Sequence, residues 1–151
     1  MPMKQFNIQS DNKNIDVVAK FIYELCDEKH ILNYEATIST PVLQAIENAI
    51  VHGNHNDPSK MVHVECDEIR GGISFLVKDE GDGFDYSQYG DIQDEGGNGI
   101  FLMRSLSDKM EYLEGGRAVR MEFMIHGIEK TYAMERVAKL ERFFAMDKTL
   151  V

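Results

Sequence analysis

Alternating apolar and polar residues are the feature of this sequence that most narrows its possible folds. Residues 62–67 alternate in this way, a Gly71-Gly72 turn follows, and residues 73–78 alternate again. A second hairpin turns about Gly115-Gly116 and leads into residues 119–125, which show the same pattern. Successive side chains of a strand point to opposite faces, so each of these strands has one apolar face and one wet face. The sequence therefore predicts antiparallel hairpins with one face covered by other elements.

Amphipathic segments between the strands predict the helices that supply this cover. A short strand is expected over residues 4–9, and Ser10 or Asp11 then caps a helix that runs to about Glu28. Another helix is expected from Ile100 onward, because apolar residues recur there at helical spacing. The predicted fold class is α+β, a two-layer sandwich in which helices cover one face of a mainly antiparallel sheet.

The tail beyond Gly127 also repeats apolar residues at helical spacing. Ala133, Val137, Leu140 and Phe144 follow one another at intervals of four, three and four residues, which predicts a helix with an apolar stripe. A chain of 151 residues has enough sequence for one core. We therefore expect one domain over residues 1–126 and a C-terminal helical extension over residues 127–151.

Charge, the spacing of cysteine and histidine, and the distribution of apolar residues argue against nucleic-acid binding, a metal site and membrane insertion. Lys and Arg number 16 against 26 Asp and Glu, for a net charge of −10, which disfavours direct binding to nucleic acid or to a membrane surface. Cys26 and Cys66 stand outside metal-binding spacings, and His52, His55 and His63 lack partner ligands at a recognisable spacing. Neither a signal peptide nor a stretch long enough to span a bilayer is visible, so we expect a cytoplasmic protein.

Residues 40–53 are predicted to form a helix that carries an unusual polar residue. Thr40 suits the N-cap and Pro41 the first helical position, and Gly53 ends the apolar pattern. Asn48 lies in the middle of this helix, where an amide has little structural reason to be. Taken alone it could be a helix-surface amide. Its side-chain oxygen is also one of the few protein ligands that Mg²⁺ usually takes, which makes Asn48 a candidate magnesium ligand.

Two glycine-rich segments follow this helix in the sequence. Asp79 ends a predicted strand, and Gly81 and Gly83 beyond it let a flat ligand approach the backbone while the carboxylate points into a pocket. An adenine amino group is a suitable partner for such a carboxylate. Gly97 and Gly99 precede the third helix, whose free N–H groups can bind a phosphate chain. Taken singly, each segment could also be an ordinary turn or loop.

Together, the segments Gln44–Gly53, Asp79–Gly83 and Gly96–Met103 resemble the N box, G1 and G2 motifs of the GHKL ATPase superfamily. The resemblance spans about residues 6–126 and implies the histidine-kinase-like ATPase fold. The short length and the runs NAIVHGN and GGNGIFLMRSLSD are most similar to bacterial anti-sigma factor serine/threonine-protein kinases. Such kinases bind Mg-ATP and a sigma factor, phosphorylate an antagonist, or anti-anti-sigma, protein on serine, and are commonly homodimers.

The resemblance also implies roles for single residues. Asn48 would be the magnesium ligand and Asp79 the acceptor for adenine, while Gly81 and Gly83 would shape the adenine pocket. The residues implied to close over the phosphates are Gly97, Gly99, Ile100 and Phe101.

Gln44 stands where the family has its catalytic glutamate, four residues before the asparagine and one helical turn back on the same face. An amide cannot accept the proton. Glu47 adjoins Asn48 but lies about 100° round the helix, so it is a poor substitute. The resemblance therefore implies an anti-sigma-type serine kinase whose catalysis is weakened, because losing a general base typically removes about 10²- to 10⁴-fold in rate.

The last hairpin departs from the family as well. It reads Gly116-Arg117-Ala118 where relatives often have Gly-Thr, whose threonine helps to fix adenine. Residues 84–98 contain acidic but no basic residues, so a triphosphate would need Mg²⁺ to offset their field. Two alternatives stay open: a catalytically degenerate protein-binding module, and a detached histidine-kinase or gyrase-type ATPase domain. The second ranks last, since no dimerisation helix pair with a phosphoacceptor histidine is seen.

Overall fold

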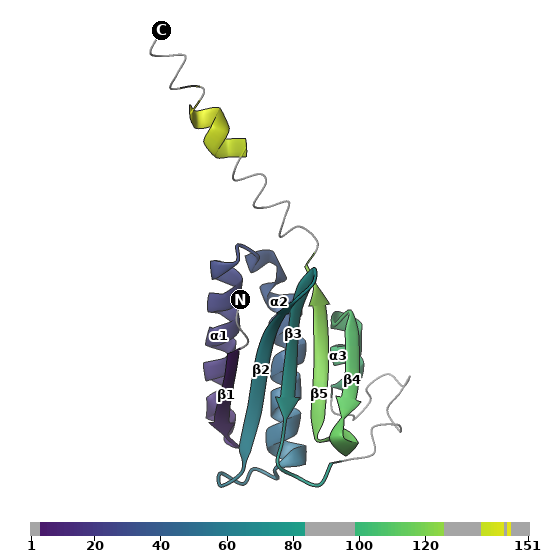
Figure 1. Cartoon of the computed structure of the whole chain (residues 1–151). Helices are drawn as coiled ribbons and strands as arrows, with labels where there is room; N and C mark the ends of the chain where they lie inside the picture. The colour runs from purple at the N-terminus through teal and green to yellow at the C-terminus, as the bar shows by residue number, and fades with distance from the viewer. Residues whose placement is uncertain (1–3, 84–98, 126–136, 144, 146–151) are drawn as a thin grey trace.

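Five strands form one sheet in the order β1-β2-β3-β5-β4, and each neighbouring pair runs antiparallel (Figure 1). The structure is a computed structural model that describes residues 4–83, 99–125, 137–143 and 145. The strands are β1 (Lys4–Gln9), β2 (Met61–Ile69), β3 (Gly72–Lys78), β4 (Lys109–Leu113) and β5 (Ala118–Met124). Both predicted hairpins are therefore present. Gly72 pairs with Ile69 as part of β3, so the first turn consists of Arg70 and Gly71, the latter with a φ of +77°.

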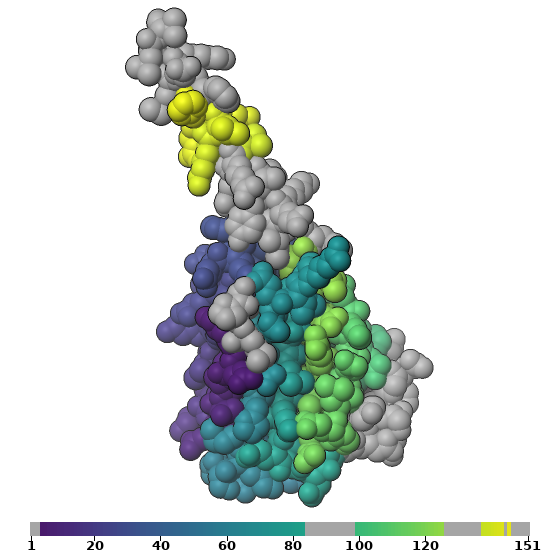
Figure 2. Space-filling view, viewed as in Figure 1, coloured from purple at the N-terminus to yellow at the C-terminus, as the bar shows by residue number. Residues whose placement is uncertain are grey.

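The helices lie on one face of this sheet, as Figure 1 shows. They are α1 (Ile15–Glu28), α2 (Glu35–Asn48) and α3 (Ile100–Leu106). Short helical turns flank them: η1 (Asn12–Asn14), η2 (Leu32–Tyr34), the π-helical turn η3 (Ala49–Gly53) and η5 (Glu114–Gly116). In the view of Figure 2, atoms of β2, β3 and β5 reach the surface on the opposite face. The predicted two-layer α+β sandwich is confirmed.

The core fills the space between the helices and the apolar face of the sheet. Val62, Val64 and Cys66 of β2 are fully buried, as their alternation predicts. Phe75 of β3 lies at the centre, with its ring centroid 6.5 Å from those of Phe21 and Phe123 in edge-to-face geometry. Such aromatic pairs stabilise a core beyond the area that they bury.

Both cysteines belong to this core as free thiols. Burial raises the pKa of the Cys26 thiol to about 11 and that of Cys66 to about 12. Both therefore stay protonated at neutral pH, and a thiol in this form is a poor metal ligand. Their role is packing.

The prediction that Thr40 begins the second helix is wrong. The helix α2 begins at Glu35, so Thr40 is helical and Pro41 lies inside the helix. Proline has a φ that fits a helix, but it lacks the N–H that would bond to the carbonyl of Thr37, and its ring crowds that carbonyl. Ile38 is fully buried one turn earlier, so packing against the core outweighs the local start signal. Asp11 caps the short turn η1 that leads into α1, and not α1 itself: its Oδ1 accepts a hydrogen bond from Lys13 N–H at 3.0 Å, and α1 begins at Ile15.

In the tail, residues 137–143 are helical, and Val137, Leu140 and Phe143 are exposed. Ala133 and Phe144, which the sequence places on the same stripe, lie outside the described residues. The division into a domain and a helical extension stays a prediction. Over the described part of the chain, no helix combines the length and the apolar character needed to cross a bilayer.

Candidate functional site

A pocket lies between α2 with its extension η3, the end of β3, and the β4-β5 hairpin. Its surface is mostly apolar, and Asn48, Asp79 and Arg117 contribute polar groups. The lining residues are Ala45, Asn48, Ala49, His52, Gly53, Val77, Asp79, Met103, Tyr112, Gly116, Arg117, Ala118 and Val119. We call this the α2–β3 pocket. It unites Asn48 and Asp79, which the sequence predicted as site residues on separate elements.

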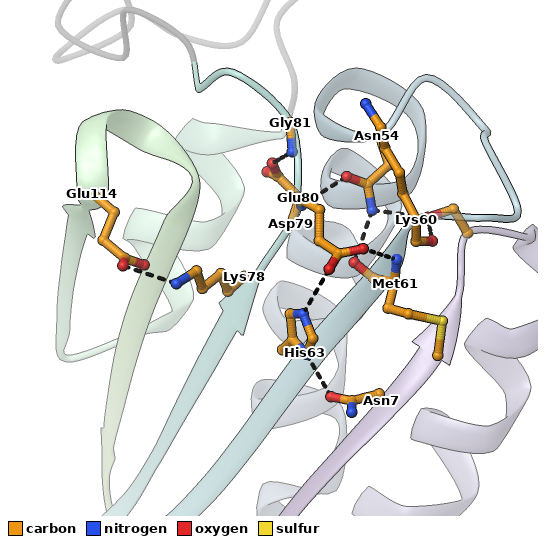
Figure 3. Close-up of polar contacts among 11 residues, drawn as sticks. Asn7, Asn54, Lys60, Met61, His63, Lys78, Asp79, Glu80, Gly81 and Glu114 are labelled. Atoms are coloured by element: carbon orange, nitrogen blue, oxygen red, sulfur yellow. Dashed lines mark hydrogen bonds and ion pairs between the residues drawn. The ribbon is translucent and has the colours of Figure 1, made fainter.

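Asp79 stands at the point where β3 ends, and its side chain is oriented by its neighbours. Its N–H donates to Arg117 O at 2.9 Å, which continues the pairing of β3 with β5 by one residue. Its Oδ1 accepts a hydrogen bond from Gly81 N–H at 2.8 Å (Figure 3). The residue is only 7% exposed. Burial is the main cause that raises the pKa of this carboxyl above its ordinary value.

Glycine makes the close contact between the helix end and the strand end possible. A Cβ on Gly53 would overlap Cγ and Oδ2 of Asp79, and a Cβ on Gly81 would overlap the carbonyl oxygen of Gly53. The end of η3 therefore packs directly on the segment 79–81. The sequence predicted only that Gly53 ends the helix. The structure adds that Gly53 leaves room for the side chain of Asp79.

Gly53→Ala is expected to lower the free energy of unfolding by about 1 to 3 kcal/mol, the usual cost of forcing a methyl group into a packed site. The measurement is urea denaturation followed by circular dichroism. Gly115→Asn is the matched control, because a Cβ at Gly115 meets nothing within 4 Å and asparagine tolerates the φ of +68° there. Equal losses in the two variants would contradict the steric explanation.

Gln44, Asn48 and Gly99 meet at the edge of the pocket. Gln44 lies one turn before Asn48 on α2, and its Nε2 donates to Asn48 Oδ1 at 3.2 Å. Gly99, with a φ of +72°, precedes α3, and a Cβ there would overlap Cγ and Cδ of Gln44. Glu47 is exposed, as its position on the helix predicts. The amide of Gln44 thus lies between the predicted magnesium ligand and the predicted phosphate-binding segment.

Residues 9–123 match the protein family described as the histidine kinase-like ATPase domain. The chain belongs to this family. Among curated proteins, this histidine kinase-like ATPase domain is similar to the anti-sigma F factor of Geobacillus stearothermophilus, with 35% identity over 81 residues, 52% of this chain and 53% of the relative. It is 38% identical to the anti-sigma F factor of Oceanobacillus iheyensis over 66 residues, 44% of this chain and 43% of the relative. The chain thus spans about half the length of the curated relatives it matches.

The remaining predicted site residues of this histidine kinase-like ATPase domain do not gather in the pocket: they lie against the hairpin, in the core, at the surface or outside the described residues. Gly83, with a φ of +83°, lies against the hairpin, where a Cβ would overlap Gly115 O. Ile100 is 1% exposed and belongs to the core, whereas Phe101 is 44% exposed. Gly97 and the acidic stretch lie outside the described residues.

Sequence reasoning missed several residues that line the pocket of this ATPase domain. Met103 and Tyr112 come from α3 and β4, where their spacing indicated only secondary structure. His52, considered from the sequence as a metal ligand without partners, also lines the pocket. Its place beside Gly53 in the asparagine-containing segment was the available signal.

Proposed function

We propose that this histidine kinase-like ATPase domain binds ATP and acts as an anti-sigma-type regulator. The observation that carries the proposal is that Asp79 and Asn48 line one largely apolar pocket. Gln44 bonds to Asn48 beside it, and Gly99 packs against Gln44. Apolar walls suit the faces of a purine, and a buried carboxylate suits the amino group at its edge. Asp79 is assigned to adenine and Asn48 to the metal that accompanies the phosphates.

The donor set fits magnesium rather than a metal held by the protein alone. The described residues contain no group of three or more His, Cys, Asp or Glu that could hold a metal ion. Mg²⁺ is commonly bound through one or two protein oxygens together with substrate phosphates and water. Asn48 Oδ1 would be the protein ligand, and the ion would neutralise phosphate charge in a protein of net charge −10.

A sigma factor is proposed as a partner from the names of the relatives, which are anti-sigma F factors. From the resemblance of the sequence motifs alone, we also propose an anti-anti-sigma protein as partner, a homodimer as the assembly and the cytoplasm as the location. Bound ATP would supply a phosphoryl group for a serine of the anti-anti-sigma protein. Gln44 cannot act as the base in this transfer, so the reaction would be slow and would depend on positioning.

Gln44 also favours a second candidate function, a protein-binding module without catalysis. Its amide donates to Asn48 where a catalytic carboxylate would accept a proton. In this case nucleotide would act as a ligand that changes the affinity for a partner, and it would not be consumed. A phosphoserine assay with the anti-anti-sigma protein of the same organism separates the two candidates.

Titration with Mg-ATP in a calorimeter is expected to give saturable binding with one site per chain. Adenine burial in the α2–β3 pocket and the contact with Asp79 supply the affinity. A parallel titration with Mg-ITP, which lacks the purine amino group, is expected to give weaker binding. If no complex with ATP forms at millimolar concentration, the chain is not a nucleotide-dependent regulator.

A further inference from the structure

Asn54 follows Gly53 directly and is a fully buried polar residue. Its Nδ2 donates to Ser10 Oγ at 2.8 Å and to the carbonyl oxygen of Met61 at 3.0 Å. Its Oδ1 accepts a hydrogen bond from Glu80 N–H at 2.8 Å, as Figure 3 shows. Both amide hydrogens and the amide oxygen are therefore engaged, which is the condition under which a buried polar group stabilises one arrangement.

The backbone of Asn54 is tied to the pocket wall. Its N–H donates to Ala49 O at 2.8 Å, five residues back, which closes the π-helical turn η3. Ala49 and Gly53, at the two ends of this turn, both line the α2–β3 pocket. π-Helical turns are rare in proteins, and those that do occur are frequently at functional sites. The backbone of Asn54 is thus hydrogen-bonded to the end of the helix that carries Asn48.

The peptide groups on either side of the Asp79 carboxylate are held from two directions. The N–H of Asp79 bonds to Arg117 O on the β5 side, and the N–H of Glu80 bonds to Asn54 on the helix side. The Glu80 side chain then turns away from the pocket: Oε1 accepts from Met61 N–H at 2.5 Å, and Oε2 lies 3.4 Å from His63 Nε2. The backbone on both sides of Asp79 is therefore held in place, in addition to the Gly81 N–H bond that orients the carboxylate itself.

We propose that Asn54 is a positioning residue for Asp79 and thereby sets the preference of this site for an adenine base. The inference rests on the proposed nucleotide function and extends it to base selectivity. Gly53 makes room for the carboxylate, and Asn54 holds the next peptide group so that the carboxylate stays aimed at the pocket. Without Asn54, the Glu80 N–H loses its acceptor, so the peptide group after Asp79 is held less firmly and the carboxylate spends less time facing the ligand.

The test compares affinities for Mg-ATP and Mg-ITP in three proteins. In the wild-type chain, ATP is expected to bind about 10- to 150-fold more tightly than ITP, the range of one hydrogen bond to a charged group. In Asn54→Ala, we expect the affinity for ATP to fall about tenfold, the affinity for ITP to change little, and the ratio to shrink accordingly. Ser10→Ala is the matched control, because it removes another bond of the same buried amide on the side away from Glu80.

A purely structural Asn54 predicts a different pattern. Both variants would then melt at lower temperature, while the ATP-to-ITP ratio stays at the wild-type value. That outcome overturns the inference and leaves the proposed function intact. If the wild-type chain binds neither nucleotide, the proposed function fails and the inference fails with it.

Hydrogen exchange in the wild-type chain keeps the inference testable if Asn54→Ala does not fold. The N–H of Glu80 should be protected, because Asn54 Oδ1 accepts its hydrogen. Mg-ADP should increase this protection further, since a bound adenine stabilises the same arrangement. Exchange of Glu80 N–H at the rate of an exposed loop would overturn the inference.

Discussion

Gln44→Glu is expected to raise the rate of ATP turnover by about 10²- to 10⁴-fold, the usual contribution of a positioned general base. The new carboxylate occupies the volume of the present amide, one turn before Asn48 and against Gly99. It can accept a proton from an attacking hydroxyl, which the amide cannot. The substitution also removes the donor to Asn48 Oδ1, and that oxygen becomes more available to a magnesium ion.

Two measurements follow the rate of this variant. Phosphate release from Mg-ATP reports turnover without a protein partner, and phosphoserine formation on the anti-anti-sigma protein reports transfer. Gln44→Met fills nearly the same volume with no proton acceptor, and Glu47→Gln removes the exposed carboxylate next to Asn48. Both controls should remain at the wild-type rate. Equal rates in Gln44→Glu and Gln44→Met would show that position 44 is not the site of a base.

Asp79→Asn is expected to weaken ATP binding by about 10- to 150-fold, because a hydrogen bond to a charged acceptor typically contributes about 1.5 to 3 kcal/mol. An amide at this position can present a donor to the purine amino group, which has no acceptor to offer there. Calorimetric titration with Mg-ATP measures the loss. Asp82→Asn removes the same charge from an exposed residue three positions later and should leave the affinity unchanged.

The same variant is expected to keep or gain stability at neutral pH. Burial raises the pKa of Asp79 in the folded state above its unfolded value, so protonation stabilises the fold. That contribution is fully present below the unfolded pKa and is lost as the pH rises through the folded pKa. The difference in unfolding free energy between Asp79→Asn and wild type should therefore increase from the unfolded pKa to the folded pKa of Asp79 and reach its maximum above the folded pKa. Urea midpoints measured from pH 3 to pH 7 test this, and a variant less stable than wild type at pH 7 would contradict it.

Local patterns predicted most elements of the fold. The alternation over residues 62–67, 73–78 and 119–125 identified strands β2, β3 and β5 and the face that packs on the helices. These patterns are reliable because strand side chains alternate faces whatever the rest of the chain does. The prediction that α2 begins at Thr40 and Pro41 was wrong because the start of a helix depends on tertiary packing as well as on local sequence. The preceding turn is helical because Ile38 is buried in the core.

The sequence by itself determined the fold class and the candidate residues Asn48, Asp79 and Gln44, because motif order and residue chemistry can be read without coordinates. Only the tertiary structure decided how these residues are held. Gly53 and Asn54 look like a helix stop and a loop residue in the sequence, yet they contact residues 79–81, some 26 positions away. Contacts between such distant segments follow from the packing of α2 on the sheet, and no local pattern records them.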